Sequence, residues 1–403
     1  MSEVPYTLCA HCALDPSLAR FIRDKGTIGT CTLCQTIQPR VVDGHVVSNV
    51  FKAVVRFHYP EWKYNDHWGM ESLADLLRRP NPLIRTEGVP SLEAEHRYEF
   101  DFGVYLDDLT SPVYPASMDA GVYLFWGFSD GVRGMYSETL QDAKSADLEK
   151  LRRSLQHTNY YAFEDEWLGR LKPSASTFTS RVAADQPFFR ARLGCRDEAL
   201  RMDQDRGLYD PLRRVFFPHI GDDLGAPKQS ATLGQRLNRP NISYLYLANT
   251  LDTAIAEVRP HPGHTVSIGQ FLSQRDLEIA DLTSIELLPF TDNEANLENF
   301  ILLRNIERSF SDPVTPDDRA GYLLTQFLAD IFRRMGFGGI KYRSSITTGT
   351  NLVVFDPLSF SYIPGSAEVR TIISLAYNTD TPLFEQQRST IQGVEYFATH
   401  RNG

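Results

Sequence analysis

The chain has 403 residues, of which 42% are hydrophobic and 23% charged, a balance typical of a globular protein with two or three domains. A formal net charge of −10 and an isoelectric point near 5.5 exclude a global positive field, so we expect no broad nucleic-acid binding. The amino terminus lacks a basic-then-apolar signal pattern, and no apolar run approaches roughly eighteen residues, so we expect a cytoplasmic protein without a membrane span.

Four of the five cysteines form two Cys-x-x-Cys pairs near the amino terminus, Cys9 with Cys12 and Cys31 with Cys34. This spacing is typical of a zinc ribbon, in which two knuckles supply four thiolates to one tetrahedral metal. Two disulfides are the alternative, which the expected reducing compartment disfavours. Because four cysteines leave no open coordination position, we expect a structural zinc ion in residues 1–40.

Two further residues are expected to have ordinary roles, and a turn is predicted after the cysteine motifs. His11 stands between two predicted ligands and is interpreted as a solvated loop residue. Cys195 follows Gly194 alone and is interpreted as a small buried thiol in preference to a nucleophile. A turn is predicted at Pro39, followed by a valine-rich segment that forms either a strand or a linker.

Residues 41–174 are predicted to be mostly helical, with some extended segments. The stretch from Met70 to Leu77 is helix-like, and aromatic runs lie at 98–105 and 123–126. Arg152 and His157 have the arginine-four-residues-histidine spacing of HEPN ribonucleases. A surface helix with solvated arginines is the preferred interpretation, because so short a pattern arises easily by chance.

Residues 175–376 show the clearest order and predict a mixed α/β domain, followed by a tail at 377–403. A short helix is expected after a cap at Thr250 or Asp252, ending before Arg259 and Pro260. A second helix is expected to begin at Thr315–Asp318, to bury one apolar stripe and to end at Gly336. Extended segments are predicted at 188–193, 244–248, 266–271, 277–282, 338–342 and 352–355.

Separate segments of this region carry an arginine, a glutamate and a serine that together suggest one site. Arg236 lies in a Gly-Gln-Arg-Leu-Asn-Arg-Pro stretch, and Glu257 lies on the short helix that follows the next strand. Helix geometry would point Glu257 back at Arg236. Ser344 lies far downstream at a strand edge, before the Asn351-Leu-Val-Val-Phe strand.

Several matching segments in the same order make this region resemble the RES domain, which is named for its arginine, glutamate and serine. They are Arg190-Ala-Arg192, Gly-x-Arg236-x-Asn-x-Pro, Tyr-Leu-Tyr246-Leu-Ala, Ala-Glu257-Val-Arg-Pro, and Tyr-Arg-Ser344-Ser with Asn351-Leu. The resemblance implies a mixed α+β fold related to ADP-ribosyltransferases over residues 175–376. RES domains are toxins of toxin–antitoxin pairs that consume NAD, either destroying it or transferring its ADP-ribose to a protein. The preceding region, with its zinc ribbon, also resembles the HEPN-like extension found ahead of some RES domains.

The residue chemistry fits this implied activity. Breaking the nicotinamide–ribose bond builds an oxocarbenium-like transition state, which a carboxylate such as Glu257 stabilises. Guanidinium groups suit pyrophosphate and ribose oxygens. The expected catalytic residues are Glu257, Arg236 and Ser344, and the expected NAD-binding residues are Arg190, Arg192, Tyr246 and Asn351. Tyr246 would offer a stacking face or a phenolic donor.

Two details limit the site prediction. Arg343 stands where related sequences often have proline, so the choice between Ser344 and Ser345 stays open. Gly336-Phe-Gly338-Gly339 breaks the Gly-x-Gly-x-x-Gly pattern of a Rossmann unit and precedes a strand. NAD is therefore expected to be a substrate and not a recycled cofactor.

The hypothesis for the whole chain is a cytoplasmic NAD-consuming toxin or defence effector that acts as an NAD glycohydrolase. One alternative is an ADP-ribosyltransferase that modifies a protein acceptor, and another is an inactive RES-like module that binds a partner. Because unrestrained loss of NAD would harm its own cell, an antitoxin or regulatory protein is an expected partner.

Overall fold

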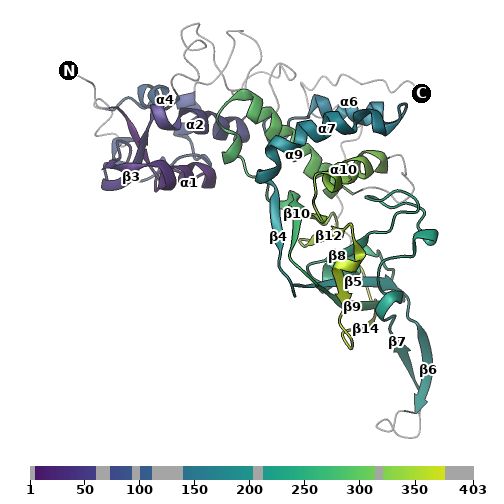
Figure 1. Ribbon diagram of the computed structural model, residues 1–403. Helices are drawn as coiled ribbons and strands as arrows, with labels where there is room; N and C mark the ends of the chain where they lie inside the picture. The colour runs from purple at the N-terminus through teal and green to yellow at the C-terminus, as the bar shows by residue number, and fades with distance from the viewer. Residues whose placement is uncertain are drawn as a thin grey trace, which may run out of the picture. The chain divides into compact units, whose positions relative to one another are not determined.

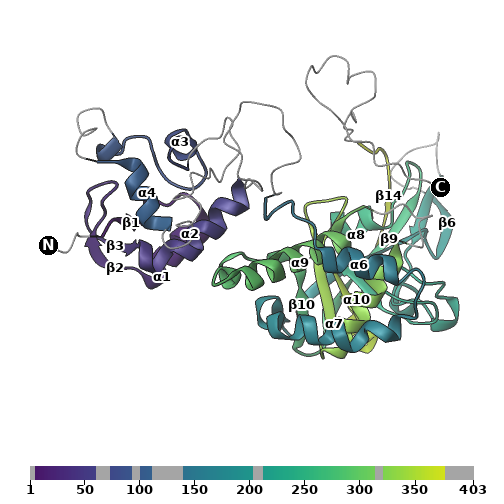
Figure 2. The same cartoon turned by 90° about the horizontal axis from the view of Figure 1, so that it is seen from above.

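The computed structural model describes residues 5–59, 73–92, 100–110, 139–202, 212–313 and 321–376 (Figure 1; the same ribbon is turned by 90° in Figure 2). The chain divides into two compact units. Unit 1 comprises Met1–Ala143, Glu286–Ile301 and Tyr377–Gly403, and unit 2 comprises Lys144–Ile285 and Leu302–Ala376. Helices and sheets occur together, which confirms the predicted α+β class. Among the described residues, no helix has the length and apolar character that crossing a membrane requires.

Unit 1 combines a small antiparallel sheet with short helices. In the described residues the sheet has three strands in the order β1-β3-β2. The strands are β1 (Thr7–Cys9), β2 (Thr27–Thr30) and β3 (Ile37–Asp43). The helices are α1 (Pro16–Lys25), α2 (Gly44–His58), α3 (Leu73–Arg78) and α4 (Phe102–Thr110). Asp15 caps α1 by accepting hydrogen bonds from Ser17 N and Leu18 N, and Phe51 of α2 and Tyr105 of α4 are fully buried.

The turn predicted at Pro39 is wrong, because Pro39 lies inside β3. The preceding residue, Gln38, has a φ of 67°, and the pairing of β2 with β3 shifts register at this point. A bulge tolerates a residue that lacks an N–H, which explains how a proline fits in a central strand. The valine-rich segment is a strand only in its first residues, which complete β3. It then continues as α2, which Asp43 caps, and does not form a linker.

The predicted helical character of residues 41–174 is found in α2, α3, α4, α6 (Ala146–Ser154) and α7 (Glu164–Leu171). Met70 to Ser72, Tyr98 and the aromatic run at 123–126 lie outside the described residues. Arg152 and Arg153 are exposed on α6, as the surface-helix interpretation predicts. The resemblance of this region to a HEPN-like extension stays a prediction.

Unit 2 is built on a mixed sheet with nine strands among the described residues. Its order is β13-β9-β5-β8-β12-β11-β10-β4, and β14 also pairs with β9. Of these pairs, β10 and β11 are parallel and the others antiparallel. The strands are β4 (Thr179–Val182), β5 (Pro187–Leu193), β8 (Leu245–Ala248), β9 (Thr265–Ser273), β10 (Leu277–Asp281), β11 (Gly339–Arg343), β12 (Thr350–Val354), β13 (Phe360–Tyr362) and β14 (Glu368–Thr371). All six predicted extended segments are confirmed within a few residues.

Other elements of the chain were predicted only in part. The helix α8 (Leu251–Glu257) is confirmed, with Thr250 as its cap. In α10 (Tyr322–Arg334) the predicted apolar stripe is buried, but its predicted start at Thr315–Asp318 lies outside the described residues. The sequence did not predict α9 (Glu294–Ser311) or the separate two-stranded ribbon of β6 (Asp197–Met202) and β7 (Leu212–Phe217), which Figure 1 labels.

Small side chains bring α8 close to the sheet. Ala254 of α8 packs in one buried cluster with Ala191 of β5, Ala248 of β8, and Val266 and Ile268 of β9. Alanine adds little volume between a helix and a sheet, so the backbones approach closely. This packing places the last residue of α8, Glu257, beside the strands β5, β8 and β12.

Candidate functional site

A cavity of about 390 Å³ lies in unit 2 at the end of α8. Its volume falls in the range of small-molecule sites. Residues of β5, β8, β11, β12, α8, α10 and the loop Gly234–Pro240 form its wall. Five of the residues predicted for the site line it: Arg190, Arg236, Tyr246, Glu257 and Asn351. The other two, Arg192 and Ser344, are not among its lining residues.

Two side chains hold the carboxylate of Glu257 by one oxygen. Ser344 Oγ donates to Glu257 Oε1 at 2.7 Å, and Asn351 Nδ2 donates to the same oxygen at 2.6 Å. No donor to Oε2 is recorded within the described part of the chain. The arrangement fixes the orientation of a carboxylate that lines the cavity.

The hydroxyl of Ser344 is fully used inside the protein. It donates to Glu257, and its oxygen accepts from Ile346 N and Thr347 N, each at 3.2 Å. One hydroxyl has one proton and two lone pairs, so no capacity is left for a ligand. Ser344 therefore positions Glu257, whereas its neighbour Ser345 lines the cavity.

Arg190 brings a half-buried positive charge to the cavity wall. Its Nε donates to Leu224 O and its Nη1 donates to Tyr246 O, both at 2.7 Å. Burial lowers the pKa of Arg190 to about 10, so the guanidinium stays charged at neutral pH. Arg192 lies two residues further along β5, is exposed, and donates to Asp223 O. The structure therefore brings Arg190 and not Arg192 to the cavity.

Arg236 contacts the end of α9 and lines the same cavity as Glu257. No hydrogen bond between these two described side chains is recorded, so the expected direction of the carboxylate towards Arg236 stays a prediction. Its Nη2 donates to Ser309 O at 2.9 Å and to Asp312 O at 2.6 Å. Terminal carbonyls of a helix lack partners within the helix and carry partial negative charge, which explains why a guanidinium binds there. Arg236 Nε is buried without a recorded hydrogen-bond partner among the described residues.

The phenol of Tyr246 is also used inside the protein. Its hydroxyl donates to Asn238 Oδ1 at 2.6 Å and accepts from Leu237 N at 3.3 Å. Burial raises the pKa of Tyr246 well above its ordinary value, so the hydroxyl stays protonated. The hydroxyl is therefore not available as a donor to a ligand. Of the two roles predicted for Tyr246, only stacking by its ring face remains possible in the cavity.

Sequence reasoning missed several residues of the cavity wall: Phe189, Gln235, Arg259, Tyr322 and Tyr342. Arg259 has a φ of 47°, the left-handed conformation that commonly ends a helix and that favours glycine. Its N–H donates to Ala256 O at 2.9 Å, which closes α8 immediately before Pro260. Arginine stands at a helix end where glycine is usual. This signal could have directed attention to Arg259.

In unit 1 the four amino-terminal cysteines form one cluster. Their sulfur atoms all lie within 4.8 Å of one another, and Cys9 Sγ lies 3.8 Å from Cys34 Sγ. Four zinc–sulfur bonds of about 2.3 Å in a tetrahedron require sulfur separations of about 3.8 Å. All four are free thiols, so the disulfide alternative is wrong. The donor set fits a closed tetrahedral metal site.

The structure bears differently on the ordinary roles predicted for His11 and Cys195. His11 is exposed in the turn between Cys9 and Cys12, as expected for a solvated loop residue. Cys195 is half-buried in the middle of the β5–β6 connection, so the prediction of a buried thiol is only partly correct.

The chain is similar to known proteins over part of its length. No curated protein matches the chain. The structure of the M. tuberculosis MbcT–MbcA toxin–antitoxin complex matches with 13% sequence identity and a TM-score of 0.28, covering 51% of this chain and 91% of that chain. The sequence model of the RES domain matches residues 211–372, which include Arg236, Tyr246, Glu257, Ser344 and Asn351. The chain therefore contains a region, residues 211–372, that matches the RES domain.

Proposed function

We propose that unit 2 cleaves the nicotinamide–ribose bond of NAD. The observation that supports this most strongly is Glu257, which lines the cavity and whose Oε1 is fixed by Ser344 and Asn351. The match to the RES domain supports the same proposal, because RES domains act on NAD as a substrate.

The proposed reaction breaks the bond between C1′ of the ribose and the pyridinium nitrogen. The bonding electrons leave with nicotinamide, and positive charge develops on C1′ and the ring oxygen of the ribose. Glu257 Oε2 stabilises that charge, as carboxylates do in glycoside cleavage. Water then adds to C1′ and loses one proton, which gives ADP-ribose. The charged Arg190 in the cavity wall suits the pyrophosphate.

Incubation of the purified full-length protein with NAD alone tests the function. We expect one nicotinamide and one ADP-ribose per NAD consumed, measured by liquid chromatography. A protein that releases nicotinamide only after a protein acceptor is added is a transferase, the alternative reaction. Failure to consume NAD under both conditions would leave the RES region as a partner-binding module and contradict the proposal.

The two neighbouring serines are expected to differ in their effect on cleavage. Ser344→Ala leaves Oε1 with one donor instead of two and removes a hydrogen bond to a charged group, so we expect kcat to fall by roughly tenfold to a hundredfold. Ser345→Ala removes a hydroxyl from the cavity wall without touching the recorded bonds of Glu257. Its effect is expected on KM, and equal losses of kcat in the two variants would argue against Ser344 as the positioning residue.

For the whole chain the proposal is a cytoplasmic toxin or defence effector that a partner restrains. An antitoxin or regulatory protein would supply that restraint. The four-cysteine cluster is proposed to hold one zinc ion with a structural role, because its donor set is complete with Cys9, Cys12, Cys31 and Cys34.

A further inference from the structure

The loop Gly234–Pro240 forms part of the cavity wall and closes on itself. Gly234 has a φ of 89°, and a Cβ at this position would lie 3.1 Å from Pro240 Cδ, so the closed form requires glycine. Gln235 N donates to Asn238 O at 2.9 Å across the loop. Gln235 and Arg236 line the cavity from this loop, so its conformation sets part of the shape of the site.

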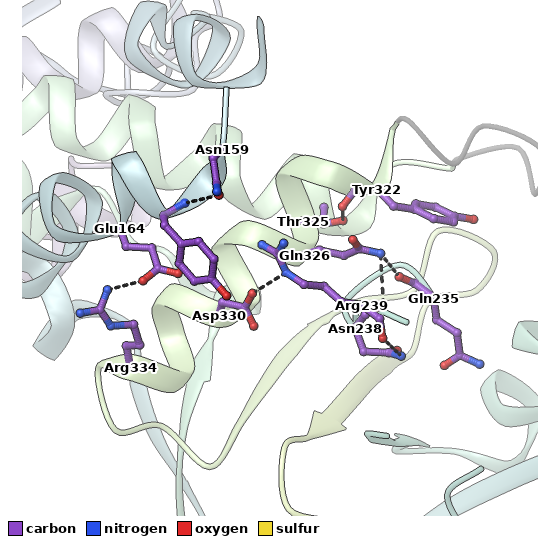
Figure 3. A network of polar contacts seen from close by, with 11 residues as sticks. Asn159, Glu164, Gln235, Asn238, Arg239, Tyr322, Thr325, Gln326, Asp330 and Arg334 are labelled. Atoms are coloured by element: carbon purple, nitrogen blue, oxygen red, sulfur yellow. Dashed lines mark hydrogen bonds and ion pairs between the residues drawn. The ribbon is translucent and has the colours of Figure 1, made fainter. Parts of the chain in front are cut away.

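The backbone of the loop is fastened to α10. Thr325 Oγ1 donates to Arg236 O at 2.6 Å, and Gln326 Nε2 donates to Gln235 O at 2.8 Å and to Asn238 O at 3.1 Å. Figure 3 shows Thr325 and Gln326 on one helix, with the amide of Gln326 between the two loop carbonyls. These bonds hold the half of the loop that carries Arg236.

Arg239 holds the other half of the loop from two sides. Its Nε donates to Asp330 Oδ2 of α10 at 2.8 Å, as the dashed line in Figure 3 marks. Its guanidinium carbon lies 3.2 Å from the centroid of the Tyr160 ring, which is a cation–π contact. The side chains of Arg239 and Asp330 are 21% and 19% exposed, so solvent screens this arrangement only partly.

Tyr160 belongs to a part of the chain that precedes the region matching the RES domain. It begins the short helix η3 (Tyr160–Phe163), which Asn159 caps by accepting from Tyr161 N at 3.2 Å. The pKa of Tyr160 is raised to about 12, mainly by burial. Its ring therefore carries no charge at neutral pH. The segment before the RES region therefore supplies one wall of the pocket that holds Arg239.

Arg334 provides a natural comparison. It joins α10 to α7 through ion pairs with Glu164 at 2.6 Å and Asp165 at 3.1 Å. These pairs fasten the same two parts of unit 2, but no recorded bond of Arg334 reaches the Gly234–Pro240 loop (Figure 3). The contacts of Arg239 hold the loop, whereas those of Arg334 only dock α10 against α7. Variants of the two sets of contacts therefore distinguish an effect of the loop from an effect of helix docking.

We propose that Arg239, held between Tyr160 and Asp330, is a positioning residue that fixes the Gly234–Pro240 loop and thereby the NAD-binding wall of the cavity. The inference rests on the proposed NAD cleavage for its effect on activity, but not for the contact itself. Since Glu257 lies on a different element, loss of the Arg239 contacts changes NAD binding and leaves the carboxylate in place.

Steady-state cleavage of NAD by full-length Tyr160→Leu, Tyr160→Phe and Arg334→Ala variants tests the positioning role. Tyr160→Leu removes the aromatic face, and we expect KM for NAD to rise by roughly threefold to thirtyfold. The kcat is expected to stay within about twofold, because the carboxylate that the proposed cleavage step uses, Glu257, lies on a different element from the loop. Tyr160→Phe keeps the ring face and Arg334→Ala keeps the loop contacts, so both are expected to retain the wild-type KM.

Hydrogen exchange of the backbone amides at 234–240 gives a readout that does not depend on activity. We expect faster exchange in Tyr160→Leu, and wild-type exchange in Tyr160→Phe and Arg334→Ala. Unchanged exchange and unchanged KM in Tyr160→Leu would overturn the inference, and so would equal changes in Arg334→Ala, which would mean that only helix docking matters. If the wild-type protein does not consume NAD, the proposed function fails, and hydrogen exchange alone still decides whether the loop depends on Tyr160.

Discussion

Glu257→Gln is expected to lower kcat for NAD cleavage by about a hundredfold to a thousandfold while the protein stays folded. The amide oxygen of glutamine can accept the same hydrogen bonds from Ser344 and Asn351 that Oε1 accepts. The variant therefore keeps the geometry of the site and removes the negative charge that faces the cavity. Nicotinamide release, measured together with circular dichroism, separates loss of chemistry from loss of folding.

Two further substitutions calibrate this result. Glu257→Ala leaves the Ser344 hydroxyl and the Asn351 amide without their acceptor, so we expect it to be less stable than Glu257→Gln by about 1–3 kcal/mol. Glu278→Gln changes an exposed acid of β10 in the same unit and is expected to retain wild-type cleavage. Wild-type activity in Glu257→Gln would contradict a role for the carboxylate charge.

Cys12→Ser is expected to abolish stable zinc binding and to unfold or strongly destabilise unit 1. Structural zinc in zinc-finger peptides contributes about 10–16 kcal/mol of apparent binding free energy, and loss of one thiolate leaves an incomplete tetrahedron. Cys12 is fully buried beside the other three cysteines. A water molecule therefore cannot take the place of the lost thiolate unless the surrounding residues move. Elemental analysis of the purified protein and thermal unfolding measure the two effects.

Cys195→Ser is the matched control for the zinc prediction. Cys195 is a free thiol outside the four-cysteine cluster, so its replacement is expected to preserve the zinc content and the unfolding of unit 1. Equal zinc content in the Cys12→Ser variant and the wild type would show that the cluster is not the metal site.

The predictable part of the fold follows from local pattern. Alternation of apolar residues indicates a strand whether or not its partner is known, which is why β5, β8, β9, β10, β11 and β12 were found. The turn predicted at Pro39 was wrong, because the bulge that accommodates this proline in β3 depends on the register of β2 against β3. The order of the strands depends on contacts between distant segments, which no local pattern specifies.

The site was predictable in its residue types but not in their bonds. Motifs brought Glu257, Ser344 and Asn351 to attention, and the structure places them in contact. The bonds of Arg236 to Ser309 O and Asp312 O could not be predicted, because α9 was not recognised and its end lies far along the chain. The difference between Ser344 and Ser345 likewise depends on the turn in which Ser344 accepts two backbone N–H groups.

A crystal structure of the Glu257→Gln variant soaked with NAD would show where the substrate binds, because the variant is expected to bind the dinucleotide without cleaving it. We expect the nicotinamide ribose in the cavity, with C1′ within about 3.5 Å of the side chain at position 257 and the pyrophosphate near Arg190. NAD bound outside this cavity, or bound inside it with C1′ turned away from position 257, would rule out Glu257 as the carboxylate that stabilises the developing charge.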